Sequence, residues 1–168
     1  PPRSPPPDME LLRRAVGQLT EGLAALHDAH KVHRDIKPSN VLVTRDERVV
    51  LLDFGVALDL DDFDAPQEAG EVVGTAAYMA PEQVLGEAAG PEADVYSVGV
   101  ILYEALTGVL PYEGTAMAVM QSKLVGLPAP PGQLVPDTPP ELDALTMELL
   151  APEASARPSA AEVARRLA

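Results

Sequence analysis

The sequence predicts a mainly α-helical domain with a small β hairpin. Its 168 residues suffice for one domain, and 46% of them are hydrophobic, which is enough to bury a core. Apolar residues recur at helical spacing along much of the chain. Only one pair of short runs, 41–43 and 49–52, has the β-branched and leucine composition typical of strands. The chain has four Tyr, two Phe and no Trp, so we expect an aliphatic core.

The first half of the chain should contain one long helix, the hairpin and a loop. A helix is expected within 9–30, where apolar residues from Leu12 to Leu26 alternate spacings of four and three and Asp8 can serve as the N-cap. The hairpin covers 41–52, with the polar residues 44–48 as its turn. Residues 59–71 are acidic and aperiodic, which indicates a solvated loop.

The second half should be helical with one interruption. A helix poor in charge begins near Pro91 and ends before Gly108, and another is expected near 115–125. The prolines between 128 and 140 argue against regular structure there. Two further helices follow, one within 142–149 and one capped by Ser159. We divide the chain into a proline-rich leader, 1–8, and a folded domain, 9–168.

The charge balance argues against several kinds of partner. Twelve Lys and Arg oppose 26 Asp and Glu, a formal net charge of −14, so nucleic acid and anionic membrane surfaces would be repelled. A basic protein partner is favoured instead. No apolar stretch is long enough to span a membrane, and the absence of Cys excludes disulfides and thiolate metal sites. We expect a cytoplasmic protein.

Two polar strings border the predicted hairpin. His33-Arg34-Asp35-Ile36-Lys37-Pro38-Ser39-Asn40 ends where the first strand begins, and Asp53-Phe54-Gly55 follows the second strand. Two carboxylates and an amide at the mouth of one hairpin suit a divalent cation beside a hydroxyl group. A plainer interpretation stays open, in which Asp35 and Asn40 only close a turn between a helix and the hairpin.

In this order the strings resemble the H-R-D-x-x-x-x-N catalytic loop and the D-F-G motif of protein kinases. Ala80-Pro81-Glu82 then corresponds to the A-P-E motif of that family. The resemblance extends from Met9 to Ala168 and includes Gly74-Thr75, Tyr78, Asp94-Val95-Tyr96-Ser97-Val98-Gly99 and Arg157-Pro158. Lys37 and Gly74-Thr75 resemble the Ser/Thr-directed branch. The sequence of the catalytic loop and the excess of Arg over Lys resemble those of a bacterial-type Ser/Thr protein kinase.

The resemblance implies transfer of the γ-phosphoryl group of ATP to a protein Ser or Thr hydroxyl. Asp35 would orient or deprotonate that hydroxyl as the catalytic base, and Lys37 would neutralise charge on the moving phosphoryl group and so contact the nucleotide. Asn40 and Asp53 would hold Mg²⁺, for which Mn²⁺ could substitute. Thr75 would contact Asp35 and help to position the substrate.

A further set of residues would support this site structurally. The resemblance implies that His33 packs against Phe54, that Gly55 lets the chain turn, and that Asp94 accepts hydrogen bonds from the catalytic loop. It also implies a buried ion pair between Glu82 and Arg157. Arg34 would face a negative charge from the acidic segment 59–71, unless that segment is only solvated. His27 and His30 are interpreted as polar residues at a helix end.

The resemblance is to the C-terminal lobe of a kinase alone. Only 32 residues precede His33, and the glycine-rich loop, strand lysine and helix glutamate of the N-terminal lobe are missing. We therefore expect an N-terminal lobe supplied in cis or in trans. Without it, the chain should lack turnover and bind Mg-ATP no tighter than roughly millimolar. The alternative is a noncatalytic module, either pseudokinase-like or a truncated scaffold.

Overall fold

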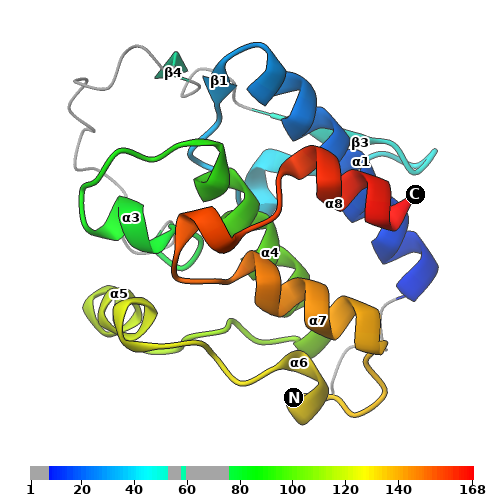
Figure 1. Cartoon of the computed structure of the whole chain (residues 1–168). Helices are drawn as coiled ribbons and strands as arrows, with labels where there is room; N and C mark the ends of the chain where they lie inside the picture. The colour runs from blue at the N-terminus through cyan, green and yellow to red at the C-terminus, as the bar shows by residue number, and fades with distance from the viewer. Residues whose placement is uncertain (1–7, 53–57, 60–75) are drawn as a thin grey trace.

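The computed structural model describes residues 8–52, 58–59 and 76–168, which form a mainly helical domain with two very small sheets (Figure 1). The mainly α fold with a small hairpin is confirmed. The helices are α1 (Met9–Asp28), α3 (Pro81–Val84), α4 (Pro91–Thr107), α5 (Ala116–Val125), α6 (Pro131–Leu134), α7 (Pro140–Leu149) and α8 (Ala160–Leu167), with 3₁₀ turns η1 (Pro38–Asn40) and η3 (Ala154–Ala156). The strands are β1 (Lys31–Val32), β2 (Val41–Val43), β3 (Val49–Leu51) and β4 (Leu58–Asp59).

The predicted helix boundaries are confirmed by capping contacts. The Asp8 carboxylate accepts hydrogen bonds from the backbone N–H groups of Glu10 and Leu11, at 3.0 and 3.1 Å. Gly108 ends α4 with a φ of 75°, a left-handed conformation that glycine adopts without steric cost. Ser159 caps α8 through the N–H of Glu162, at 3.2 Å. Asp8, which the sequence placed in the leader, thus contributes to the first helix.

The structure adds a sheet that the sequence did not predict. β2 and β3 form the expected antiparallel hairpin, with Val41 opposite Leu51. In addition, β1 pairs with β4, Lys31 opposite Asp59, so Asp59 belongs to a strand and not to a loop. Two-residue strands are too short to show an alternating pattern, and such a pairing is set by tertiary contacts.

The proline-dense segment was expected to lack regular structure, and this prediction was wrong at one place. Residues Pro131–Leu134 form the short helix α6, and Pro131 occupies its first turn. Pro140 occupies the first turn of α7 in the same way. The first N–H groups of a helix have no partner within the helix, so a proline there sacrifices no hydrogen bond.

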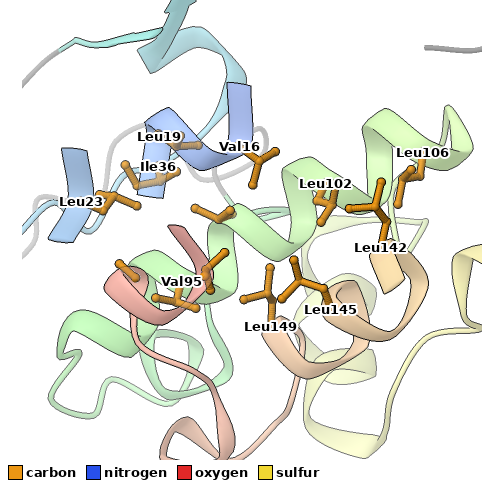
Figure 2. Packing of buried hydrophobic residues seen from close by; sticks show 13 residues of the cluster. Val16, Leu19, Leu23, Ile36, Val95, Leu102, Leu106, Leu142, Leu145 and Leu149 are labelled. Atoms are coloured by element: carbon orange, nitrogen blue, oxygen red, sulfur yellow. The ribbon is translucent and has the colours of Figure 1, made fainter. Parts of the chain in front are cut away.

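The core forms where α4 packs between α1 and α7 (Figure 2). Gly99 of α4 allows close approach, because a Cβ at this position would lie 2.7 Å from the Cβ of Leu149 in α7. α8 packs along α1, beside which it lies in Figure 1. Ile36 belongs to the same cluster, so the core holds the 33–40 segment from beneath. None of the described helices combines the length and the apolar composition that a membrane-spanning helix needs.

Candidate active site

The backbone of the 33–40 segment is held by a buried carboxylate at the start of α4. Asp94 Oδ2 accepts a hydrogen bond from the N–H of His33 at 2.9 Å, and Oδ1 accepts one from the N–H of Arg34 at 2.7 Å. Arg34 has a φ of 64°, a conformation that costs a non-glycine residue about 1–3 kcal/mol. The hydrogen bonds to a charged acceptor offset this cost. The contact implied by the resemblance for Asp94 is therefore present.

Asp35, Lys37 and Asn40 come together in this segment. The amide nitrogen of Asn40 donates to the backbone oxygen of Asp35 at 2.8 Å and to its carboxylate Oδ2 at 3.0 Å. Lys37 Nζ lies 2.9 Å from the same Oδ2. The Asp35 side chain remains 20% exposed. It is thus an oriented carboxylate at the surface, able to accept a proton from a hydroxyl group placed beside it.

His33 ties this segment to the end of the hairpin. Its Nδ1 accepts from the N–H of Asp35 at 3.4 Å, and its Nε2 lies 3.1 Å from the carbonyl oxygen of Leu52. A tautomer with the hydrogen on Nε2 satisfies both contacts. The N–H of Leu52 in turn donates to the carbonyl of Asn40 at 2.8 Å. The residue before Asp53 is therefore bonded to both ends of the 33–40 segment.

The remaining predicted site residues cannot be placed in the same way. Asp53, Phe54, Gly55 and Thr75 lie outside the described residues, as does the part of the acidic segment from 60 to 71. The predicted metal pair of Asn40 with Asp53, the packing of His33 on Phe54 and the acidic partner of Arg34 stay predictions. What the structure gives for the Arg34 side chain is a hydrogen bond from Nε to the carbonyl of Ala89, at 3.2 Å.

Asn40 suits the role of an oxygen ligand for magnesium. Both hydrogen bonds from its side chain to Asp35 use the amide nitrogen, because the atoms that it meets on Asp35 are acceptors. The amide oxygen takes part in neither, and it is a hard donor of the kind that Mg²⁺ prefers. Within the described stretches, no group of three or more His, Cys, Asp or Glu side chains could hold a metal ion.

Glu82 and Arg157 form the expected ion pair between α3 and the turn before α8. Arg157 Nη1 donates to Glu82 Oε1 at 2.6 Å, and Nη2 donates to Oε2 at 2.9 Å. The side chain of Arg157 is 0% exposed and that of Glu82 is 10% exposed. Two parallel bonds from a planar guanidinium fix the orientation of both groups. This contact fastens the start of α3 to residues 75 positions later in the chain.

Three contributors to this region were missed by the sequence reasoning. His27 lies in the last turn of α1, as expected, but its Nε2 also lies 2.9 Å from Asp94 Oδ2, a contact that the sequence reasoning did not predict. It follows Leu23 by one turn on the buried side of α1, which was a usable signal.

The Gln83 side chain donates to the carbonyl of Arg34 at 3.1 Å and accepts from the N–H of Ala80 at 3.0 Å. Lys123 is the third contributor, and it donates hydrogen bonds to the backbone just before α3. No local sequence pattern identifies Lys123 or Gln83 as a contributor.

These features define a protein kinase domain, and the comparisons agree. Residues 6–166 match the family model described as protein kinase domain, and the chain belongs to this family. The predicted resemblance to a bacterial-type Ser/Thr kinase domain is confirmed.

The relatives found are bacterial serine/threonine-protein kinases. The chain is 38% identical over 144 residues to PknB of Mycolicibacterium smegmatis, which covers 83% of this chain and 23% of that protein. It is 44% identical over 134 residues to PknA of Mycobacterium tuberculosis, with 78% and 30% covered. It is 39% identical over 156 residues to the probable kinase PkwA of Thermomonospora curvata, with 93% and 20% covered. The chain thus spans less than a third of the length of these curated relatives.

Proposed function

We propose that this chain supplies the catalytic loop of a Ser/Thr protein kinase that transfers the γ-phosphoryl group of ATP to a protein hydroxyl. The observation that supports this most directly is the grouping of Lys37 and Asn40 around one carboxylate oxygen of Asp35. Asp35 would orient the substrate hydroxyl and accept its proton. The acidic net charge of −14 favours a substrate protein with basic residues near the target hydroxyl.

The remaining roles follow the same proposal. Lys37 would contact the nucleotide and neutralise charge on the phosphoryl group in transfer. Asn40 and Asp53 would hold Mg²⁺ or Mn²⁺, which when bound bridges the phosphates of ATP and offsets their charge. Thr75 would help to position the substrate. Asp94 would keep the backbone of residues 33 and 34 in place through its two hydrogen bonds.

Phosphotransfer would require an N-terminal lobe, in cis or in trans, because this sequence contains no glycine-rich loop or strand lysine. We propose residues 1–8 as a leader and 9–168 as the C-terminal lobe, in a protein that acts in the cytoplasm. The chain alone would then bind Mg-ATP no tighter than roughly millimolar. Isothermal calorimetry on the chain tests this, and micromolar binding would contradict it.

The decisive experiment replaces Asp35 by Asn in a protein that joins this chain to its N-terminal lobe. Phosphate transfer from radiolabelled ATP to a protein substrate should fall by about 10²–10⁴. Asp46→Asn, in the exposed turn of the hairpin, is the matched control and should leave the rate unchanged. A D35N variant that folds and retains full activity would refute the role of Asp35. An inactive wild type with both lobes would favour the scaffold or pseudokinase alternative.

A further inference from the structure

Lys123 of α5 is a buried cation with an unusual set of partners. Its residue surface is 1% exposed, although lysine is almost never buried unless it is paired. Its Nζ donates to three backbone carbonyls, those of Ala76 at 2.9 Å, Ala77 at 2.7 Å and Met79 at 2.6 Å. An ammonium group has three N–H donors, and here each has an acceptor. Among the residues that the structure describes, no carboxylate forms an ion pair with Lys123.

The three carbonyls belong to one short stretch of chain. Residues 76–79 lie between Thr75, the predicted substrate-positioning residue, and the start of α3. The carbonyl of Tyr78, which Lys123 does not contact, accepts a hydrogen bond from Ser97 Oγ of α4 at 2.8 Å. Two side chains from α5 and α4 thus satisfy four consecutive carbonyls. A segment outside regular helices and strands has no ladder of its own to do this, so these side chains determine its path.

The same segment forms one wall of a small cavity. Ala76 and Ala77 line it together with Val119, which lies one turn before Lys123 on α5, and Tyr112 and Glu113 of the α4–α5 connection. The cavity measures about 200 Å³. Any change in how Lys123 holds residues 76–79 would therefore also change the shape of this surface hollow, where α5 faces the segment that precedes α3.

We propose that Lys123 is a positioning residue that holds residues 76–79 in the conformation used to receive the protein substrate. This inference rests on the proposed kinase function, and it assigns a substrate-side role to a residue far from the catalytic loop in sequence. Lys123 donates to the segment that leads from Thr75 to α3, whereas its hydrogen bonds in the described part of the chain do not involve Asp35, Lys37 or Asn40. Loss of the Lys123 side chain should therefore weaken binding of the protein substrate and leave the rate of ATP hydrolysis unchanged.

The surroundings of Lys123 also make the stability of residues 76–79 depend on pH. Burial lowers its pKa from 10.5 to about 7. The ring of Tyr96 lies 5.3 Å from Nζ, and Arg157, paired with Glu82, lies on the same ring at 4.9 Å. Burial raises the pKa of Tyr96, and it raises that of Tyr112 to about 12, so neither tyrosine titrates near neutrality.

The sign of this dependence follows from proton linkage. When residues 76–79 open and Lys123 reaches water, its pKa returns towards 10.5, so the open form binds more protons than the closed form above pH 7. Opening should therefore become less favourable as the pH rises from about 7 towards 10, and more favourable in acid. Without the amine at position 123 this dependence disappears.

Hydrogen–deuterium exchange on the chain tests the proposal without any need for activity. In Lys123→Met the amides of residues 76–79 should exchange about tenfold faster at pH 9, since their carbonyls lose the N–H donors of the amine. Gln121→Met, at an exposed position of the same helix, should leave them unchanged. In the wild type, protection of 76–79, corrected for the intrinsic rate, should increase from pH 6 to pH 9. Should K123M fail to fold, this wild-type series still decides, and a flat profile overturns the proposal.

Kinetics on the protein with both lobes test the substrate-side role. K123M should raise KM for the protein substrate about tenfold, with kcat and the ATP hydrolysis rate measured without substrate nearly unchanged. Equal losses in ATP hydrolysis and in protein phosphorylation would overturn the proposal. A wild-type protein with no phosphotransfer would instead refute the kinase function, and the exchange result would remain as a separate observation on Lys123.

Discussion

Arg157→Met should be one of the most destabilising single substitutions in this chain. The Arg157 guanidinium makes two hydrogen bonds to Glu82 and one each to the carbonyls of Ala151, Glu92 and Pro152, at 2.8, 3.0 and 3.0 Å. Methionine fills much of the volume but donates nothing. The substitution leaves a carboxylate that is 10% exposed without its cation, and three carbonyls without donors.

The expected loss in the free energy of unfolding is about 3–5 kcal/mol, the range for removal of one partner of a buried ion pair. The double variant E82M/R157M should be more stable than R157M by at least about 1 kcal/mol, because no charge then stays buried alone. Urea unfolding followed by far-ultraviolet circular dichroism measures both values, since the chain has no Trp for fluorescence.

Arg14→Met is the matched control for this measurement. Arg14 pairs with Glu47 at 2.8 Å, but the two side chains are 52% and 50% exposed. An exposed pair contributes only about 0.2–1 kcal/mol, so R14M should change stability little. The reasoning is refuted if R157M costs no more than R14M, or if the E82M/R157M variant is as unstable as the sum of its single variants.

Three further predictions address packing, the loop and pH. Gly99→Ala should cost about 1–3 kcal/mol, since the new Cβ would lie 2.7 Å from that of Leu149, and unchanged urea unfolding would contradict it. Asp94→Asn should cost about 1–3 kcal/mol and speed amide exchange at His33, because an amide nitrogen would replace one acceptor oxygen in a buried position; full protection at His33 would count against this. The wild-type free energy of unfolding should gain more than that of K123M between pH 7 and 9, because Lys123 has a folded pKa of about 7 and binds a proton again on unfolding; parallel curves would exclude it.

Helices with a long apolar stripe could be predicted from the sequence because burial on one face imposes a periodic pattern. This holds for α1, whose buried residues include Val16, Leu19 and Leu23. α4 is buried on most sides, since residues 93–100 are all buried, and it could be predicted from its low charge and from Pro91 and Gly108 at its ends. The two-residue strands β1 and β4 and the four-residue helices α3 and α6 leave no such pattern. Their conformation is set by tertiary packing and by proline at a first turn.

Some contacts of the candidate site could be predicted from the sequence and others could not. The proximity of Asp35 and Asn40 could be predicted because both lie in one short string before the hairpin. The contacts of Asp94, and of Glu82 with Arg157, could be predicted only through the resemblance to kinases. Those of His27 with Asp94, Gln83 with Arg34 and Lys123 with Ala76 join residues 67, 49 and 47 positions apart. The position of His27 after Leu23 indicates that it faces inward, but nothing local in the sequence identifies the partner in any of these pairs, because only the fold brings the partners together.

The bond between Glu82 and Arg157 has a consequence for the order of events during protein synthesis. Arg157 is translated 75 residues after Glu82. At roughly 5–20 residues per second, the carboxylate waits about 4–15 seconds for its cation. α8, which covers α1, emerges later still. Until Arg157 emerges, the start of α3 lacks this ion pair, so the packing of the domain is completed late in synthesis.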